Sequence, residues 1–231
     1  MIYISDNIKF IRHAIAEAAF ASGRGAGEVQ LVAAAKTQPY SFIRAVIEAG
    51  VDAVGENRVQ EMTSKHAEGA YEGAPLHFIG HLQSNKVSRV VGLCDLIESV
   101  GSLPLLEQIG RHATAKNITQ NVLIEVNIGS EPQKTGILPG QASEIISAAS
   151  QIKGVNVLGL MSIPPINDEN ENNCYYFEKM FQLFVDMSAK KYDNVSMSFL
   201  SMGMSDSYSE AIRAGANIVR VGSAIFGERT L

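Results

Sequence analysis

Residues 31–55 of the chain read LVAAAKTQPYSFIRAVIEAGVDAVG, and this stretch decides the fold class. It begins with an apolar run, Leu31–Ala35, and continues through an amphipathic segment, Ser41–Ala49, that Gly50 ends. A second short run follows at Asp52–Gly55. Short apolar runs predict buried strands, and longer segments with apolar residues at helical spacing predict helices. The stretch therefore predicts a strand, a helix and a second strand that is parallel to the first.

The same alternation continues along the chain. We count eight predicted strands, and each but the last is followed by a helix. The strands are Leu31–Ala35, Asp52–Gly55, Leu76–Ile79, Leu93–Val100, Asn121–Ile128, Val155–Met161, Ser196–Leu200 and Asn217–Val221. The helices that follow them are Ser41–Ala49, Asn57–Glu68, Ser84–Val91, Leu103–Lys116, Gln141–Ile152, Tyr175–Lys190 and Tyr208–Ala214. A further helix, Ser5–Ser22, precedes the first strand, because Ile8, Ile11 and Ile15 recur at helical spacing.

Two architectures fit this order of elements. Alternating strands and helices predict a parallel sheet, which is either a closed (β/α)8 barrel or an open doubly wound sheet. The additional N-terminal helix favours the barrel, because such a helix can cover the bottom of a barrel. We therefore expect an α/β protein, a single (β/α)8 TIM barrel domain over residues 1–231 with an extra N-terminal helix.

The composition argues against several classes of protein. The chain has 231 residues, of which 46% are apolar and 19% charged, as in one soluble globular domain. Its net charge of -5 argues against nucleic acid as a partner, and no apolar run approaches the roughly 18 residues of a membrane helix. Two cysteines, Cys94 and Cys174, cannot form a disulfide framework, and no targeting segment is apparent. We expect a cytoplasmic protein that binds neither nucleic acid nor membranes.

Polar residues follow nearly every predicted strand at its carboxyl end, where barrels place their active sites. Lys36 comes directly after the first strand. Its ammonium group either extends into water or is held in a partly desolvated barrel mouth, where a lowered pKa lets the neutral amine form a Schiff base. The residues alone leave both interpretations open.

Two segments after the seventh and eighth strands are typical of phosphate binding, because barrels often bind phosphate there. The hydroxyl and backbone N–H groups would come from Ser201, Gly203, Ser205, Gly222 and Ser223. The alternative for the first segment is a plain turn between strand and helix. We expect Asp206 to cap the following helix, because a carboxylate that faced a phosphate would repel it.

Arg220 and His81 are the remaining candidates. Arg220 lies among apolar residues of the last strand, and a charge there needs a partner, which could be a phosphate, a carboxylate or a ring nitrogen. His81 follows the third strand and is either a structural residue or part of a pocket. We find no dinucleotide fingerprint, no zinc-protease motif and no paired C-x-x-C, and we expect no metal site.

Several of these segments together resemble a known family, the pyridoxal phosphate homeostasis proteins, also known as the PLP-binding or proline synthase co-transcribed family. The resemblance runs from about Leu31 to Gly227, and its motifs are long and specific. They are Ala34–Thr37, Gly55–Glu61, His77–Lys86, Ser201–Asp206 and Arg220–Gly227.

The resemblance implies a barrel like the N-terminal domain of alanine racemase, with pyridoxal 5'-phosphate (PLP) held as a Schiff base on Lys36. Arg220 would face the pyridine nitrogen. Phosphate contacts and other pocket positions would be Ser201, Gly203, Ser205, Gly222, Ser223, Asn57 and His81. Lys134 lies in another family stretch, and its role stays open. Tyr40 has the spacing of a phosphate-binding tyrosine of racemases, but this family does not require one, so we interpret it as incidental.

The residues also bear on whether such a protein is an enzyme. A cation beside the pyridine nitrogen weakens the electron sink of PLP, and racemases take a second base from a domain that this sequence lacks. We therefore expect a monomeric PLP-binding protein of intracellular PLP homeostasis without robust catalysis or catalytic residues, with apo PLP-dependent enzymes or amino acids as further partners. Alternatives are a PLP-dependent racemase-like enzyme and a cofactor-free Schiff-base aldolase that acts on a sugar phosphate.

Overall fold

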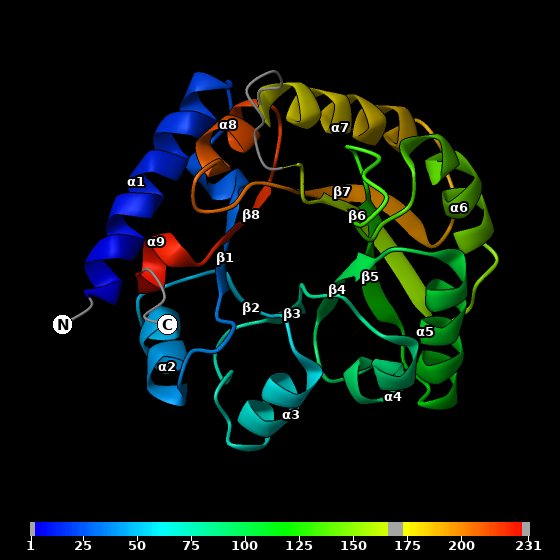
Figure 1. Cartoon of the computed structure of the whole chain (residues 1–231), viewed down its shortest axis with the longest axis horizontal. Coiled ribbons are helices and arrows are strands. Elements are labelled where there is room, and N and C mark those ends of the chain that lie inside the picture. Colours follow the sequence, from blue (N-terminus) through cyan, green and yellow to red (C-terminus); the bar gives the residue numbers. More distant parts are fainter. Residues whose placement is uncertain (1–2, 166–172, 228–231) are drawn as a thin grey trace.

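A computed structural model describes residues 3–165 and 173–227. Eight parallel strands form a closed barrel in chain order, and the last pairs with the first. Figure 1 shows the strands around a common centre, with helices as an outer ring. The strands are β1 (Gln30–Ala34), β2 (Ala53–Glu56), β3 (Leu76–Phe78), β4 (Leu96–Val100), β5 (Gln120–Val126), β6 (Val155–Ser162), β7 (Val195–Ser201) and β8 (Ile218–Val221). The predicted barrel is confirmed, and the open sheet is wrong.

The predicted helices are also present, with shifted ends. They are α1 (Ile4–Ala21), α2 (Tyr40–Glu48), α3 (Val59–Ala67), α4 (Val87–Val90), α5 (Leu103–Ala115), α6 (Ala142–Ala149), α7 (Asn173–Ser188) and α8 (Tyr208–Arg213). A short α9 (Ser223–Phe226) follows β8. The helix predicted at Ser84–Val91 is split into a 3-10 turn, Ser84–Lys86, and the four residues of α4.

The first helix has a different place from the one predicted. α1 does not cover the bottom of the barrel; it packs against α2, α8 and α9 and lies in the outer ring (Figure 1). The Asn7 side chain donates a hydrogen bond to the Ile225 carbonyl oxygen at 2.9 Å, and Ile8 and Ile11 are buried. Because α9 has only four residues, α1 fills the side that a longer last helix would cover.

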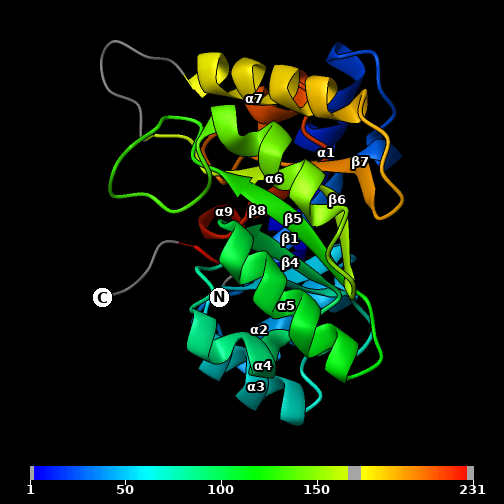
Figure 2. The same cartoon turned by 90° about the vertical axis from the view of Figure 1, so that its right-hand side faces the viewer.

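The apolar core has two parts. The larger lies between the strands and the helices, and the smaller fills the barrel interior with Val32, Ala53, Leu96, Leu123, Met161 and Ile218. Four charged side chains, Glu56, Glu98, Glu125 and Arg220, are also buried on strands. Figure 2 shows the barrel from the side, where β5 points toward the end that carries its following loop and α9. This mouth of the barrel, at the carboxyl ends of the strands, holds the candidate site.

Candidate functional site

Lys36 lies just beyond the end of β1 in a turn that neighbouring groups hold in place. Thr37 has a left-handed backbone, with φ of 63°, which is uncommon for a residue other than glycine. Its N–H donates to Glu61 Oε2 on α3 at 2.8 Å, and its hydroxyl donates to the Lys36 carbonyl oxygen at 2.6 Å. These two hydrogen bonds hold the backbone of the turn at Lys36 and Thr37 in its conformation. The Lys36 residue is exposed, which agrees with the first of the two interpretations that the residues left open, an ammonium group that extends into water.

A cavity of about 580 Å³ lies beside Lys36. Its walls come from the ends of β1 and β8, from α9 and from the loop after β7. The lining residues are Ala34, Lys36, Gln38, Met204, Ser205, Asp206, Arg220, Gly222, Ser223, Phe226 and Gly227. We call it the Lys36 cavity. It has the size of a small-molecule site and brings together four of the predicted site residues besides Lys36, namely Ser205, Arg220, Gly222 and Ser223.

The serine and glycine segments meet across this cavity. The Ser205 hydroxyl accepts hydrogen bonds from the N–H groups of Gly222 and Ala224, each at 3.2 Å. A Cβ atom on Gly222 would lie 3.4 Å from the Ala34 carbonyl oxygen, an ordinary packing distance, so the ends of β1 and β8 lie close together here. The prediction that Asp206 caps α8 is wrong. The residue at the cap is Ser207, whose hydroxyl accepts from the Met204 N–H at 3.3 Å, and Asp206 lines the cavity instead.

Ser201 and Gly203 have internal roles in this structure. The Ser201 hydroxyl is fully buried and donates to Glu98 Oε2 at 2.6 Å, and it also accepts from the Arg220 guanidinium. Gly203 has φ of 92°, and its carbonyl oxygen accepts from the Arg220 N–H at 3.1 Å. Neither residue lines the Lys36 cavity. Their direct contact with a phosphate stays a prediction.

Arg220 is the centre of a buried polar network beneath the cavity. Its guanidinium donates to the Ser162 carbonyl oxygen at 2.9 Å and lies 3.7 Å from Glu98 Oε2. The other oxygen of Glu98 lies 2.7 Å from His77 Nδ1. A carboxylate is thus among the partners that the sequence left open for Arg220, and the guanidinium also contacts Ser201 and Ser162.

The charges in this network shift one another's pKa. Burial alone raises the pKa of Glu98, but the hydrogen bond and charge of His77, with Arg220 and Ser201, bring it below its ordinary value. Burial lowers the pKa of Arg220 below its ordinary value, and the negative charges of Glu98 and Glu125 offset only part of this effect. An arginine keeps its proton at neutral pH in proteins, so the guanidinium is a permanent cation at the base of the Lys36 cavity.

Comparison with known proteins identifies the family. Residues 8–230 match the family model of the alanine racemase N-terminal domain. The chain is 41% identical to the pyridoxal phosphate homeostasis protein of Aquifex aeolicus over 208 residues, 90% of each chain. It is 36% identical to that of Escherichia coli K12, over 98% of this chain and 97% of the relative. The chain belongs to the pyridoxal phosphate homeostasis protein family.

Solved structures agree with this assignment. A protein of unknown function from Bifidobacterium adolescentis is 39% identical, with a TM-score of 0.90 over 96% of this chain and 94% of that chain. PipY of Synechococcus elongatus, in a structure with PLP bound, is 28% identical, with a TM-score of 0.82 over 97% and 100%. An alanine racemase of Clostridium difficile is 15% identical, with a TM-score of 0.71 over 98% of this chain and 60% of that one, which shows a shared fold.

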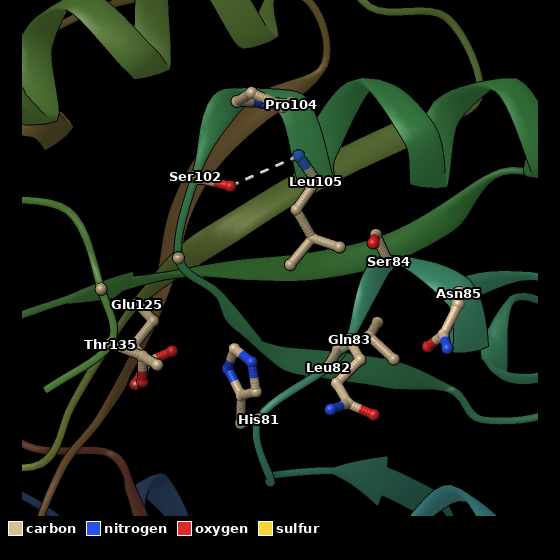
Figure 3. A pocket seen from close by; sticks show the side chains of 12 residues that line it. His81, Leu82, Gln83, Ser84, Asn85, Ser102, Pro104, Leu105, Glu125 and Thr135 are labelled. Atoms are coloured by element: carbon tan, nitrogen blue, oxygen red, sulfur yellow. Dashed lines mark hydrogen bonds between the residues drawn. The ribbon is translucent and has the colours of Figure 1, made fainter.

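Besides Ser201 and Gly203, two further predicted residues of this family member, Asn57 and His81, do not line the Lys36 cavity. Asn57, after β2, is half-buried, and its Oδ1 atom has no hydrogen-bond partner in the part of the chain that the structure describes. His81 lines a second cavity of about 710 Å³ (Figure 3). Lys134, whose role the sequence left open, contacts Glu131 at 2.5 Å and the Pro164 carbonyl oxygen at 3.1 Å.

Two buried carboxylates near the mouth, Glu98 and Glu125, were not among the predicted site residues. Both lie inside strands that we read as apolar runs, and both are buried near the mouth. The Thr135 hydroxyl donates to Glu125 Oε1 at 2.7 Å, whereas Oε2 has no hydrogen-bond partner within the described residues. Burial raises the pKa of Glu125, which Thr135, Arg220 and His81 partly offset. A lone carboxylate in a central strand was the signal that could have revealed each of them.

Proposed function

We propose that this protein binds PLP in the Lys36 cavity and serves intracellular PLP homeostasis without robust catalysis. The single observation that carries the proposal is that Lys36 and the Ser205–Gly222 contact line one cavity in a member of this family. An amine that can bond to an aldehyde and a small polar loop that can receive a phosphate are the two groups that PLP requires.

The residues of the cavity fit the cofactor. Lys36 would hold the aldehyde end through a reversible covalent link, and Ser205, Gly222 and Ser223 would hold the phosphate. Asp206, which also lines the cavity, would repel a phosphate. The phosphate is therefore expected on the α9 side, away from this carboxylate.

When bound, PLP supplies an electron sink whose strength depends on protonation of its pyridine nitrogen. A permanent cation, Arg220, lies at the base of the cavity, and a cation near that nitrogen disfavours its protonation. This arrangement supports a site that holds the cofactor and keeps it from stray amines. It argues against one that drives amino-acid chemistry. Ser201 and Gly203 would act by positioning Arg220, and Asn57 and His81 would complete the mouth.

The proposal extends to the whole protein. Residues 1–231 would act as one PLP-binding domain, a cytoplasmic monomer that delivers PLP to apo PLP-dependent enzymes or exchanges it with amino acids. In the described residues, no helix has the length and apolar character needed to cross a membrane. Delivery would be tested by mixing the loaded protein with an apo-enzyme. Activation no faster than with an equal concentration of free PLP would count against a delivery role.

The decisive experiment is reductive trapping. The purified protein mixed with PLP should show a visible absorbance band that borohydride bleaches, and peptide mapping should find the label on Lys36. The Lys36→Ala variant should lose the band, and Lys9→Ala, a matched change on the exposed face of α1, should keep it. A label on another lysine would refute the site. Amino-acid racemisation that requires Lys36 would refute the absence of catalysis and favour the racemase-like alternative.

A further inference from the structure

The second cavity lies at the same mouth of the barrel as the Lys36 cavity, on the β3–β5 side. It has a volume of about 710 Å³, enough for a small organic molecule. Figure 3 shows Glu125 and Thr135 on one side of it, His81 below, and Ser102 and Leu105 above. We call it the Glu125 cavity.

The unusual feature of this cavity is the carboxyl group of Glu125. The residue is only 6% exposed, and one oxygen accepts from Thr135 while the other, Oε2, has no partner among the described residues. A buried carboxylate oxygen without a hydrogen bond costs free energy. A ligand that donates a hydrogen bond would remove this cost.

The backbone packs closely around Glu125. A Cβ atom on Gly101 would lie 2.9 Å from the Gly136 nitrogen and 3.3 Å from Glu125 Oε2. Gly136 itself has φ of 106°. Two glycines therefore bring the loop after β5 close to the end of β4 without covering the carboxylate with side chains.

The charges of the cavity decide which ligand fits. Within the described residues, no lysine or arginine lines it, and His81 is its single basic side chain. Arg220, on β8, acts on Glu125 through its charge but lines the other cavity. A phosphate or a carboxylate would be repelled by Glu125, whereas a cation would be attracted.

We propose that the Glu125 cavity binds a small molecule that carries a protonated amine, with the ammonium group donating to the Glu125 carboxylate. The exposed polar side chains of Gln83, Ser84 and Asn85 would contact the rest of that molecule at the rim. This inference goes beyond the proposed function and does not rest on it, because the Glu125 cavity has its own lining. The two cavities would hold an amine and PLP side by side.

The test uses a tertiary amine, N,N-dimethylethanolamine, which is protonated at neutral pH and cannot form an imine with an aldehyde. Its neutral isostere, 3-methylbutan-1-ol, has the same shape without the charge. We expect the amine to bind the PLP-loaded protein and to shift the NMR signals of the Gly101 and Gly136 amides. The alcohol should bind about tenfold more weakly or worse, since a charge-assisted hydrogen bond is lost. Inorganic phosphate should leave these signals unchanged.

Variants locate the binding. Glu125→Gln keeps the acceptor for Thr135 and should weaken amine binding about tenfold or more, whereas Glu144→Gln on the exposed face of α6 should bind like the wild type. Leu105→Phe should also block the cavity, which keeps the test valid if Glu125→Gln does not fold. Lys36→Ala should bind the amine normally. Equal binding of amine and alcohol, equal binding by the Glu125 and Glu144 variants, or loss in Lys36→Ala would each overturn the proposal.

Discussion

Replacing Glu98 with alanine is expected to destabilise the barrel by about 3 kcal/mol. Glu98 is fully buried and lies 2.7 Å from His77 Nδ1, 2.6 Å from the Ser201 hydroxyl and 3.7 Å from the Arg220 guanidinium. Alanine would remove the carboxylate that neutralises Arg220 and would leave that cation buried, with the charge of Glu125 as partial compensation.

The magnitude follows from the geometry. Removing one partner of a buried ion pair costs roughly 3–5 kcal/mol. We take the lower end because the 3.7 Å separation is longer than a direct hydrogen bond and Ser201 bridges the two groups. For a domain of this size the loss corresponds to a fall of about 6–12 °C in the melting temperature. The Glu144→Ala variant, on the exposed face of α6, should change stability by less than about 0.5 kcal/mol.

The assay is thermal and urea unfolding at neutral and acidic pH. The pKa of Glu98 is lower in the folded protein than its ordinary value, so its charge contributes stability above the pKa of the unfolded chain. That contribution is lost as the pH falls through the folded pKa. The difference between wild type and Glu98→Ala should therefore be largest at neutral pH and should shrink in acid. Equal melting temperatures at pH 7, or a difference that grows in acid, would refute this account of the network.

Three further predictions concern separate parts of the fold. Gly203→Ala should lose about 2 kcal/mol of stability in urea unfolding, because the backbone has a φ of 92° and the new Cβ atom would lie 2.6 Å from the Ala211 methyl group on α8. Gly140→Ala, where a Cβ atom would meet no other atom within 4 Å, should lose none. Burial raises the pKa of Cys94 to about 12, so it should react with Ellman's reagent at pH 8 only after unfolding. Glu61→Ala should weaken PLP binding about fivefold in an absorbance titration, because the Thr37 N–H loses its acceptor.

Each of these outcomes can fail clearly. Unchanged stability of Gly203→Ala would mean that the loop after β7 moves freely. Rapid labelling of Cys94 in the native protein would mean that the helices around it open readily. Unchanged PLP affinity in Glu61→Ala would mean that the turn at Lys36 is held by the flanking backbone alone.

The alternation of short apolar runs and amphipathic segments predicted the barrel, because the hydrophobic pattern of each strand and helix is visible within its own residues. The strand predicted at Leu31–Ala35 and the observed Gln30–Ala34 differ by one residue at each end. Closure of the sheet and the place of α1 depend on contacts between distant segments, such as Asn7 with Ile225, which no local pattern encodes. The bottom of the barrel was therefore the wrong place for the first helix.

The candidate site was predicted in part for a similar reason. Lys36, Ser205 and Gly222 stand at strand ends, where position along the chain indicates the mouth. His81 stands at such an end too, but it lines a different cavity of the mouth, which position along the chain does not distinguish. Glu98 was hidden inside a strand, although the reasoning that required a partner for Arg220 applies to it equally.

The position of α1 has a consequence for how the protein is made. Its buried face, with Ile8, Ile11 and Ile15, packs against elements whose residues, such as Ala211 and Ile225, come some 200 positions later. At ordinary rates of synthesis the interval is about 10–40 s. During that time the part of the apolar face of α1 that packs against α8 and α9 lacks its final partners, although α2 has already been made. The barrel and its ring of helices can therefore close only after β8 and α9, at the far end of the chain, have been made.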